Sequence, residues 1–537
     1  MFEMNLAEKQ FQEQIKAAEQ HLETERNVLV TQCQRRDSAQ EKEYYMCTFD
    51  ADEEFDEAAS FLTRFGFVCL RNMVSDEKRL RLESKINAWL ESLQTGLNCN
   101  DFSTFVNSKM PDNFSNGVLD GIVPPSFAET REKSAKKTEL VNDANLPHFR
   151  CGKSSQSVMN REHGKEVHAL VNNNPEMTER FLTEMPIYSV AREAPGNDDE
   201  INTELQTVAE MRYRFDTLSN SQEAWNIRTD PKIYRFFRRI LQAGDDLLVS
   251  IDRFAYQRPI QSRPRGSTED WKNNYEHRPV WEHNPFWKGD PLLITKNLSE
   301  AESTSMRAQK TYNKVCDGSL FMAQSHRKQQ GSKKRKLVEE DYADKPCLPF
   351  FSGYQGILAV CDMPIDGGAV NLVAGFHIVY KDYAMAHVEE WSNTTENIIH
   401  AQKGDEMAER LVLKNAVSIA MRAGTMLIYD KRLPRWGSPN RRVAKPTVAM
   451  FISMWPREPI YDAAYRRIRA LSVRYGIRCT ALRHLTGHSA TAPRWKREFA
   501  TEIYNSYNMP LFTELGLCLL GVRNFTTALV QKSLKVE

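Results

Sequence analysis

The sequence predicts an α+β protein in which short apolar strands are combined with amphipathic helices. Residues 75–93 and 230–243 carry apolar side chains at helical spacing, and Ser75-Asp76-Glu77 supplies good capping chemistry for the first of these helices. Apolar, β-rich runs occur in four segments: 65–70, 247–256, 354–380 and 423–455. Each of the last two segments contains two runs separated by turn chemistry, Asp-Gly-Gly in one and Ser-Pro-Asn in the other.

The composition is that of an ordinary globular chain. The 537 residues can bury at least one large core, and 41% of them are hydrophobic while 27% are charged. The 72 Lys and Arg residues nearly cancel the 71 Asp and Glu residues, which excludes a global electrostatic argument for binding nucleic acid. No run of about 18 apolar residues occurs, so we expect no transmembrane helix and no membrane partner.

The cysteines predict a reducing, intracellular compartment, either cytoplasmic or nuclear. Ten cysteines are scattered along the chain, and none are paired as Cys-x-x-Cys, which argues against a zinc ribbon or a thioredoxin-type site. The N-terminal segment is acidic and helical in pattern. It therefore resembles neither a signal peptide nor a transit peptide.

Changes in composition divide the chain into three regions. Residues 1–50 are a helical extension, 51–457 form the main domain, and 458–537 are a helical C-terminal region. Polar segments of mixed character predict insertions into the main domain at about 94–225 and 288–350.

A long helix is predicted near the N-terminus. The segment 3–45 lacks Gly and Pro, and its apolar side chains recur on one helix face: Leu6, Phe11, Ile15, Ala18 and Leu22. Two interpretations fit this face equally well. The helix binds a partner protein, or it packs on its own domain.

Four segments, in order, resemble the phytanoyl-CoA dioxygenase family of Fe(II)/2-oxoglutarate oxygenases. They are FGFVCLRNMVSDEKRLRLESKI (65–86), DPKIYRFFRRILQAGDDLLVSIDRFAYQRP (230–259), GILAVCDMPIDGGAVNLVAGFH (356–377) and AGTMLIYDKRLPRWGSPNRR (423–442). The resemblance covers less than half of the chain, and it depends on the order of the segments rather than on one motif. It implies a double-stranded β-helix, or jelly-roll, core with flanking helices.

The family's first metal motif, Trp-His-x-Asp, is altered in this chain. Non-haem Fe(II) oxygenases hold iron with two imidazoles and one carboxylate. The matching stretch begins at Trp281, so that Glu282 stands in the histidine slot and Asn284 in the aspartate slot. Moving the alignment by one residue brings in His283 but no carboxylate. Glu282 and His283 are both competent ligand types, but adjacent strand residues point to opposite faces unless the strand bulges.

The second metal motif and the cosubstrate slots are altered as well. Counting back from Asn440 and Ser438 in the family's His-x-Ser-x-x-Asn-like motif puts Arg435 in the histidine slot. Guanidinium is a permanent cation without a lone pair, so it repels Fe(II) and cannot bind it. The arginine that holds 2-oxoglutarate in the family is absent, and its slot falls between Lys445 and Thr447. Lys445 supplies a charge but not a bidentate fork.

Three other features suggest chemistry outside this constellation. His387-Val388-Glu389 is a ligand-type pair but follows the third segment, so we expect an ordinary histidine there. An Arg-rich stretch that includes Arg466 and Arg469 suggests contact with nucleic acid or, alternatively, an outer helix face paired with acids. A basic run resembles a nuclear-import signal, with a solvated loop as the alternative: Lys333, Lys334, Arg335 and Lys336.

These observations predict a catalytically silent member of the dioxygenase fold, without a cofactor, that serves as a structural or binding component of an assembly. Protein partners would bind through the N-terminal helix and the insertions. Jelly rolls also build virus shells, which makes a particle component consistent with the fold. The first alternative is an active hydroxylase that uses Fe(II) and 2-oxoglutarate with a displaced triad. The second is a nuclear protein associated with nucleic acid.

Overall fold

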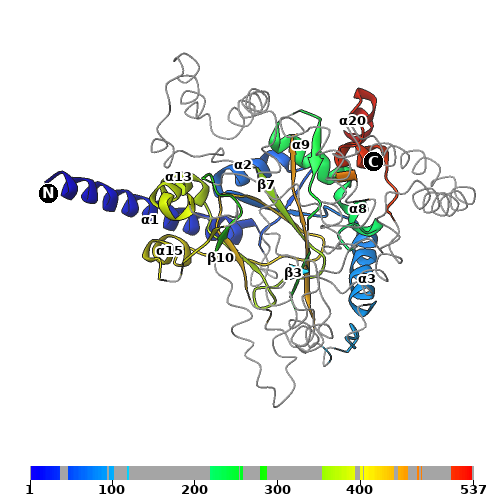
Figure 1. Ribbon diagram of the computed structural model, residues 1–537, viewed down its shortest axis with the longest axis horizontal. Coiled ribbons are helices and arrows are strands. Elements are labelled where there is room, and N and C mark those ends of the chain that lie inside the picture. The colour runs from blue at the N-terminus through cyan, green and yellow to red at the C-terminus, as the bar shows by residue number, and fades with distance from the viewer. Residues whose placement is uncertain are drawn as a thin grey trace, which may run out of the picture.

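The computed structural model describes residues 2–36, 46–92, 96–101, 104, 118–119, 218–242, 244–252, 254–257, 279–286, 353–392, 399–402, 404–438, 440, 445–456, 469–470, 473 and 509–534. Within these residues the protein combines β-sheets with surrounding helices (Figure 1), which confirms the predicted α+β class. The two predicted insertions and the basic run Lys333–Lys336 lie largely or wholly outside the described residues. None of the described helices is long and apolar enough to span a membrane.

The larger sheet has seven described strands and carries most of the core. Its order is β1 (Phe49–Asp50), β2 (Phe67–Arg71), β11 (Met426–Asp430), β7 (Tyr354–Ala359), β13 (Thr447–Ile452), β5 (Phe254–Gln257) and β3 (Val118–Leu119). Apart from the parallel pair β1 and β2, neighbouring strands are antiparallel. Strand β7 packs closely against its neighbours at Gly356, where an added Cβ would lie only 2.8 Å from the carbonyl oxygen of Ile452.

A second sheet has five described strands in the order β10 (Val417–Ile419), β8 (Val370–Leu372), β12 (Arg435–Gly437), β6 (Val280–Trp281) and β9 (Ile399–His400). In this sheet Arg435 is the register partner of both Val280 and Leu372. A third, two-stranded sheet pairs β14 (Met454–Pro456) with β4 (Leu247–Val249).

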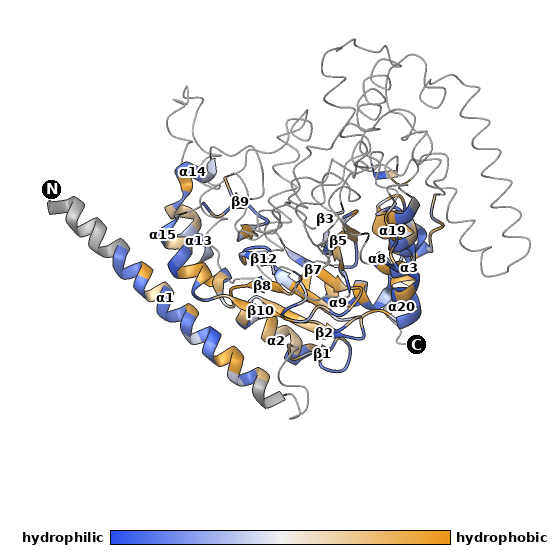
Figure 2. Ribbon diagram, turned by 90° about the horizontal axis from the view of Figure 1, so that it is seen from below, coloured by the Kyte–Doolittle hydropathy of each residue, from blue (hydrophilic) through white to orange (hydrophobic). Residues whose placement is uncertain are grey.

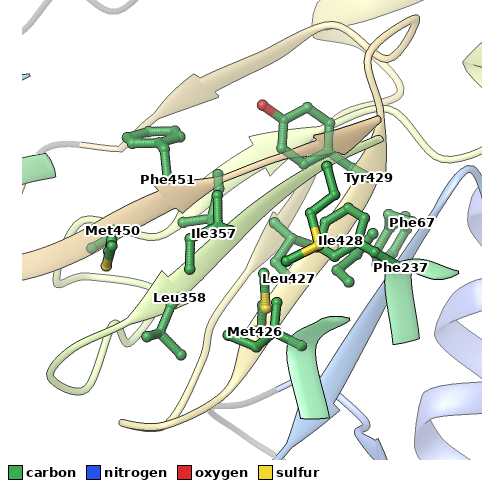
Figure 3. Close-up of a cluster of buried hydrophobic side chains, with 14 of the residues drawn as sticks. Phe67, Phe237, Ile357, Leu358, Met426, Leu427, Ile428, Tyr429, Met450 and Phe451 are labelled. Carbon is green, nitrogen blue, oxygen red and sulfur yellow. The ribbon is translucent and has the colours of Figure 1, made fainter. Parts of the chain in front are cut away.

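The two faces of the seven-stranded sheet have different neighbours. Figure 3 shows Tyr429 and Phe451 on one face and Met426, Leu358 and Met450 on the other, as the pleat requires. Helix α9 (Pro231–Leu241) covers the second face, where Phe237 lies against Met426 and Gly356. Every residue of β11 is buried, which is typical of a central strand covered on both faces.

Local sequence explains where helix α9 begins and ends, and confirms the helix predicted over 230–243. The side chain of Asp230 accepts a hydrogen bond from the backbone N–H of Lys232 at 2.9 Å, and Pro231 occupies the first helical position. Gln242 ends the helix in the left-handed conformation. Burial of a Phe side chain such as Phe237 contributes roughly 1.5–3 kcal/mol.

Other helices lie around the sheets (Figures 1 and 2). They are α2 (Phe55–Phe65), α3 (Asp76–Ser92), α8 (Gln222–Arg228), α13 (Phe376–Ala386), α14 (Val388–Ser392), α15 (Glu406–Ala408), the π-helical turn η9 (Glu409–Leu413), α19 (Glu514–Leu520) and α20 (Thr527–Leu534). Helix α3 confirms the helix predicted after Ser75.

Two strand predictions need correction. The single strand predicted over 247–256 is two strands, β4 and β5, which pair with different sheets. The chain leaves β4 at Ser250, which pairs with Ser453, before it enters the larger sheet. The run predicted to extend to residue 380 ends at β8, because Gly375, at φ 77°, begins helix α13 and places His377 in that helix.

The N-terminal helix α1 (Phe2–Arg36) packs on its own domain over its C-terminal half. Leu22 and Leu29 are 0% and 1% exposed. Glu19 forms a two-pronged ion pair with Arg410 of η9, at 2.8 and 2.9 Å. Although α1 is largely hydrophilic (Figure 2), its apolar residues Ile15, Leu22 and Leu29 face the domain. The predicted face is buried at Ile15 and Leu22 and partly buried at Ala18, while the side chains of Leu6 and Phe11 lie outside the described residues.

Candidate functional site

The candidate site lies between the two larger sheets, at the end of β6. Trp281 is the last residue of that strand, so Glu282 follows directly after it. Because Arg435 pairs with Val280 across β6 and β12, it stands beside the same strand end. Tyr429 of β11 and Phe451 of β13 approach from the seven-stranded sheet. Residues of four strands therefore meet at one point, and β6 is far in the sequence from the three consecutive strands β11, β12 and β13.

Both carboxylate oxygens of Glu282 accept hydrogen bonds. Arg435 donates from Nη2 to Oε1 in an ion pair, and the hydroxyl of Tyr429 donates to Oε2 at 2.6 Å. The side chain of Glu282 is 1% exposed and that of Arg435 is 12% exposed. The carboxylate is thus held by a cation on one side and by a neutral donor on the other, in a place with little water.

The surroundings of the two buried cations at this site, Arg435 and Lys431, affect their charge. The guanidinium carbon of Arg435 lies 5.2 Å from the ring centroid of Phe451 and 5.9 Å from that of Tyr429, within the range of cation–π attraction. Burial by itself lowers the pKa of Arg435, but the charge of Glu282 and the contacts with Glu282 and Tyr429 together outweigh burial, so the pKa is raised and the guanidinium stays protonated. Lys431 is also buried nearby, and burial lowers its pKa against the opposing charges of Glu282, Asp252 and Asp430.

The residues at this place do not fit an Fe(II) triad. A metal needs convergent lone pairs, but the Arg435 guanidinium offers none and repels a divalent cation. The two oxygens of Glu282 already accept hydrogen bonds from Arg435 and Tyr429. In the part of the chain that the structure describes, no three His, Cys, Asp or Glu side chains are grouped to hold a metal ion.

The two residues after Glu282 have other partners. Asn284 is fully buried, donates from Nδ2 to the carbonyl oxygen of Trp391 at 2.9 Å, and accepts from the N–H of Phe286 at 3.0 Å. An aspartate in this position could not donate to the Trp391 carbonyl. His283 is 1% exposed, and its carbonyl oxygen accepts from the hydroxyl of Tyr380 at 2.7 Å. The side chains of Glu282 and Asn284 are therefore both engaged in hydrogen bonds with other parts of the protein.

The predicted cosubstrate residues act in hydrogen bonds between strands and loops. Asn440 is buried and donates to the carbonyl oxygens of Gln257 and Lys445, at 3.1 and 2.8 Å. Ser438 accepts from Nδ2 of Asn371 at 2.8 Å. The hydroxyl of Thr447 donates to the carbonyl oxygen of Gly367, while the Lys445 side chain is exposed.

His387, the ligand-type residue outside the motifs, belongs to a separate cluster. Its Nε2 lies 3.1 Å from Oδ2 of Asp405, and its Nδ1 lies 2.8 Å from the carbonyl oxygen of Tyr383. Both ring nitrogens therefore face acceptors, an arrangement that favours the doubly protonated ring. Burial lowers the pKa of His387, but the hydrogen bonds with Asp405 and the Tyr383 carbonyl, together with the nearby negative charges, outweigh it, so the net pKa is raised.

The position of Arg469 differs from both of its predicted roles, nucleic-acid contact and an outer helix face paired with acids. Arg469 is fully buried and donates to the carbonyl oxygens of Leu520 and Val249, each at 2.7 Å, so it joins α19 to β4 rather than facing solvent. A buried arginine of this kind cannot bind a phosphate backbone. Arg466 and the basic run Lys333–Lys336 lie outside the described residues.

Three ionisable side chains that lie beside Glu282 or His387 were not predicted from the sequence: Tyr429, Lys431 and Asp405. The first two belong to the stretch Tyr429-Asp430-Lys431-Arg432, in which a strand ends in a run of polar residues that are nevertheless buried. Such a run was the available signal, because buried ionisable side chains are rare unless paired. Asp405 gave no signal, since its partner His387 lies 18 residues away, on the other side of α14 and β9.

Comparison with known proteins supports the family resemblance. No family model matches the chain. A Dictyostelium discoideum protein named “Putative phytanoyl-CoA dioxygenase” is 23% identical over 240 residues, which are 44% of this chain and 55% of that protein. The match thus spans about half the length of that relative.

Two solved structures match the chain at low similarity. The GlcNAc-inducible protein GIG2 of Candida albicans is 10% identical, with a TM-score of 0.44 over 96% of this chain and 87% of its own. The non-haem α-ketoglutarate-dependent epimerase SnoN of nogalamycin biosynthesis is 11% identical, with a TM-score of 0.22 over 45% of this chain and 60% of its own. The predicted resemblance is confirmed by the curated relative: over 44% of its length, the chain is similar to a protein of the phytanoyl-CoA dioxygenase type.

Proposed function

We propose that this chain is a catalytically inactive, phytanoyl-CoA dioxygenase-like protein that acts as a structural or binding component of a larger assembly. The observation that carries the proposal is the contact of Arg435 and Tyr429 with the two oxygens of Glu282. In the family that this chain resembles, the corresponding place holds iron. Here a buried cation belonging to the protein occupies the slot of a metal-binding histidine.

The proposed core is a double-stranded β-helix, and the strand connections support it. Strands β5, β6, β7 and β8 alternate between the seven-stranded and five-stranded sheets, and β10, β11, β12 and β13 alternate in the same way. A chain wound as a jelly roll alternates between two facing sheets in this manner. The contacts of Arg435 with Tyr429 and Phe451 then lie in the interior between the sheets.

An internal ion pair explains how such a core remains stable without a metal. Burying the Glu282 carboxylate alone would cost several kcal/mol, and a metal ion offsets that cost in an active oxygenase. The Arg435 guanidinium supplies the opposite charge permanently, and Tyr429 satisfies the second oxygen. We infer that the pair replaces the structural contribution of a metal but cannot replace its chemistry.

Iron binding and cosubstrate turnover test the inactive assignment. The purified chain is incubated anaerobically with Fe(II) and 2-oxoglutarate, desalted, and analysed for bound iron and, after admission of oxygen, for succinate. We expect no more iron or succinate than with the Glu282→Gln variant. One equivalent of iron that is lost in Glu282→Gln, together with succinate formation by the wild type, would overturn the assignment.

The assembly role needs a separate measurement. Tagged wild-type chain and a Glu282→Met/Arg435→Met variant are expressed in cells of the source organism, and their extracts are fractionated by sedimentation. We expect both chains to sediment with a complex far larger than the 62.0 kDa monomer. Sedimentation of the wild type as a monomer alone contradicts the assembly role without affecting the iron result.

A further inference from the structure

Three sulfur atoms meet where the end of helix α1 contacts the domain. The Sγ of Cys33, near the C-terminal end of α1, lies 3.2 Å from the Sγ of Cys47 and 3.2 Å from the Sδ of Met46. A disulfide bond is about 2.05 Å long, so the two cysteine sulfurs need approach by only about 1.2 Å. The contact is between thiols, since neither cysteine is in a disulfide in this structure.

Both sides of the contact are held by the fold. Cys33 lies one helical turn beyond Leu29, which is 1% exposed, so both face the domain. On the other side, the N–H of Met46 donates to the carbonyl oxygen of Ala420 at 3.0 Å. Two residues after Cys47 the chain enters β1, which pairs with β2. The proximity of the two thiols therefore follows from tertiary contacts on each side.

A small oxidant can reach this pair. Cys33 is partly exposed, and Cys47, although only 2% exposed, lines a groove of about 630 Å³ between the end of α1 and helix α2. Gln32 of α1 and Phe61 of α2 line the same groove. The neighbouring Cys69 is not among the residues that line the groove, and burial raises the pKa of its thiol, so it reacts less readily with an oxidant.

We propose that Cys33 and Cys47 are a redox-responsive pair that closes to an intramolecular disulfide when the protein meets a peroxide. One thiolate attacks hydrogen peroxide and becomes a sulfenic acid, as the O–O bond breaks and hydroxide leaves. The second thiolate attacks the sulfenic sulfur, forms the S–S bond and expels the oxygen as water. Overall, two thiols and one hydrogen peroxide give one disulfide and two waters, and a thiol reductant reverses the bond.

The disulfide would change how α1 is attached. In the thiol state the helix is held by buried Leu22 and Leu29 and by ion pairs such as Glu25 with Arg64, at 2.8 Å. Ion pairs of this kind are partly exposed and weaken as salt is raised. A bond between Cys33 and Cys47 would fix the C-terminal end of α1 to the segment that leads into β1, the first strand of the larger sheet. This device is independent of the proposed inactivity of the Glu282 site.

The test uses the full chain and peptide mapping. Reduced protein is exposed to graded hydrogen peroxide, remaining thiols are alkylated, and the protein is digested with trypsin without reduction. Arg35, Arg36 and Lys42 separate the two cysteines, so a disulfide joins two tryptic peptides that are otherwise distinct. We expect the joined peptide to appear with loss of both alkylated peptides, and to disappear after treatment with dithiothreitol.

Variants test whether the disulfide forms specifically between Cys33 and Cys47. Cys33→Ser and Cys47→Ser are expected to abolish the joined peptide, whereas Cys99→Ser, a change at another partly exposed cysteine, leaves it unchanged. Amide exchange over 22–33 should slow on oxidation of the wild type but not of Cys33→Ser. If both peptides stay alkylated while other cysteines oxidise, or if either residue forms only bonds between chains, the proposal is wrong.

Discussion

Glu282 and Arg435, which are 153 residues apart in the sequence, form an ion pair that joins the end of β6 to the start of β12. The carboxylate is almost completely buried, and the guanidinium lies over two aromatic rings. Removing an ion pair inside a core from water costs free energy. The pair stabilises the folded protein only when both partners are present, because a single buried charge is left uncompensated. The first predictions follow from this dependence.

Arg435→Met should destabilise the protein by about 3–5 kcal/mol, because it leaves the Glu282 carboxylate buried without its cation. Chemical denaturation of the purified variant measures the loss. The double variant Glu282→Met/Arg435→Met removes both charges and should recover most of it. A double variant no more stable than Arg435→Met would show that packing around the guanidinium, rather than charge, governs the effect.

Tyr429→Phe should cost more stability than Tyr380→Phe. The hydroxyl of Tyr429 donates to a carboxylate, and hydrogen bonds to charged groups contribute about 1.5–3 kcal/mol. The hydroxyl of Tyr380 donates to the neutral carbonyl of His283, a bond of about 0.5–1.5 kcal/mol. Both rings are buried, so denaturant midpoints of the two variants can be compared directly. Equal losses would contradict the assignment of a charged carboxylate at Glu282.

The pair of His387 and Asp405 should make stability depend on pH. Because the folded pKa of His387 is raised above its ordinary 6.5, its contribution is fully present below that value and is lost as the pH rises through the folded pKa. Asp405→Asn keeps the oxygen that caps α15 but removes the charge. We expect this variant to lose more unfolding free energy at about pH 6 than at about pH 9.

Urea denaturation of the wild type and of Asp405→Asn at the two pH values measures this difference. His387→Gln serves as the control, because it removes the titrating ring and should abolish the pH-dependent part. The pKa of Asp405 is lowered in the folded state, so its own contribution fades only as the pH falls through that lowered value. A loss that is the same at both pH values would contradict a charged His387.

Leu22→Ala should weaken the attachment of α1, because Leu22 is 0% exposed and a cavity at such a site costs about 2–5 kcal/mol. Hydrogen exchange over 15–33 measures the attachment, and faster exchange is expected throughout the segment. Lys16→Ala, at an exposed position of the same helix, is the control and should leave exchange unchanged. Unchanged exchange in Leu22→Ala would contradict a helix held by its apolar face.

The sequence by itself determined the local elements and the chemical content of the altered motifs. Asp230-Pro231 and the apolar spacing after it specify helix α9, because capping and periodicity are properties of adjacent residues. The presence of Arg435 where a ligand is needed is also a sequence fact, since guanidinium has no lone pair in any fold. The order of four segments was sufficient to predict the family resemblance.

Only the tertiary structure decided which side chains meet. Strand pairing over long sequence separations depends on burial and register rather than on local propensity, so the sequence could not show that Tyr429 donates to Glu282. The same reason explains the division of 247–256 between two sheets and the burial of Arg469, both of which differ from expectation. The approach of Cys33 to Cys47 likewise requires a docked helix, because chain proximity alone does not orient two thiols.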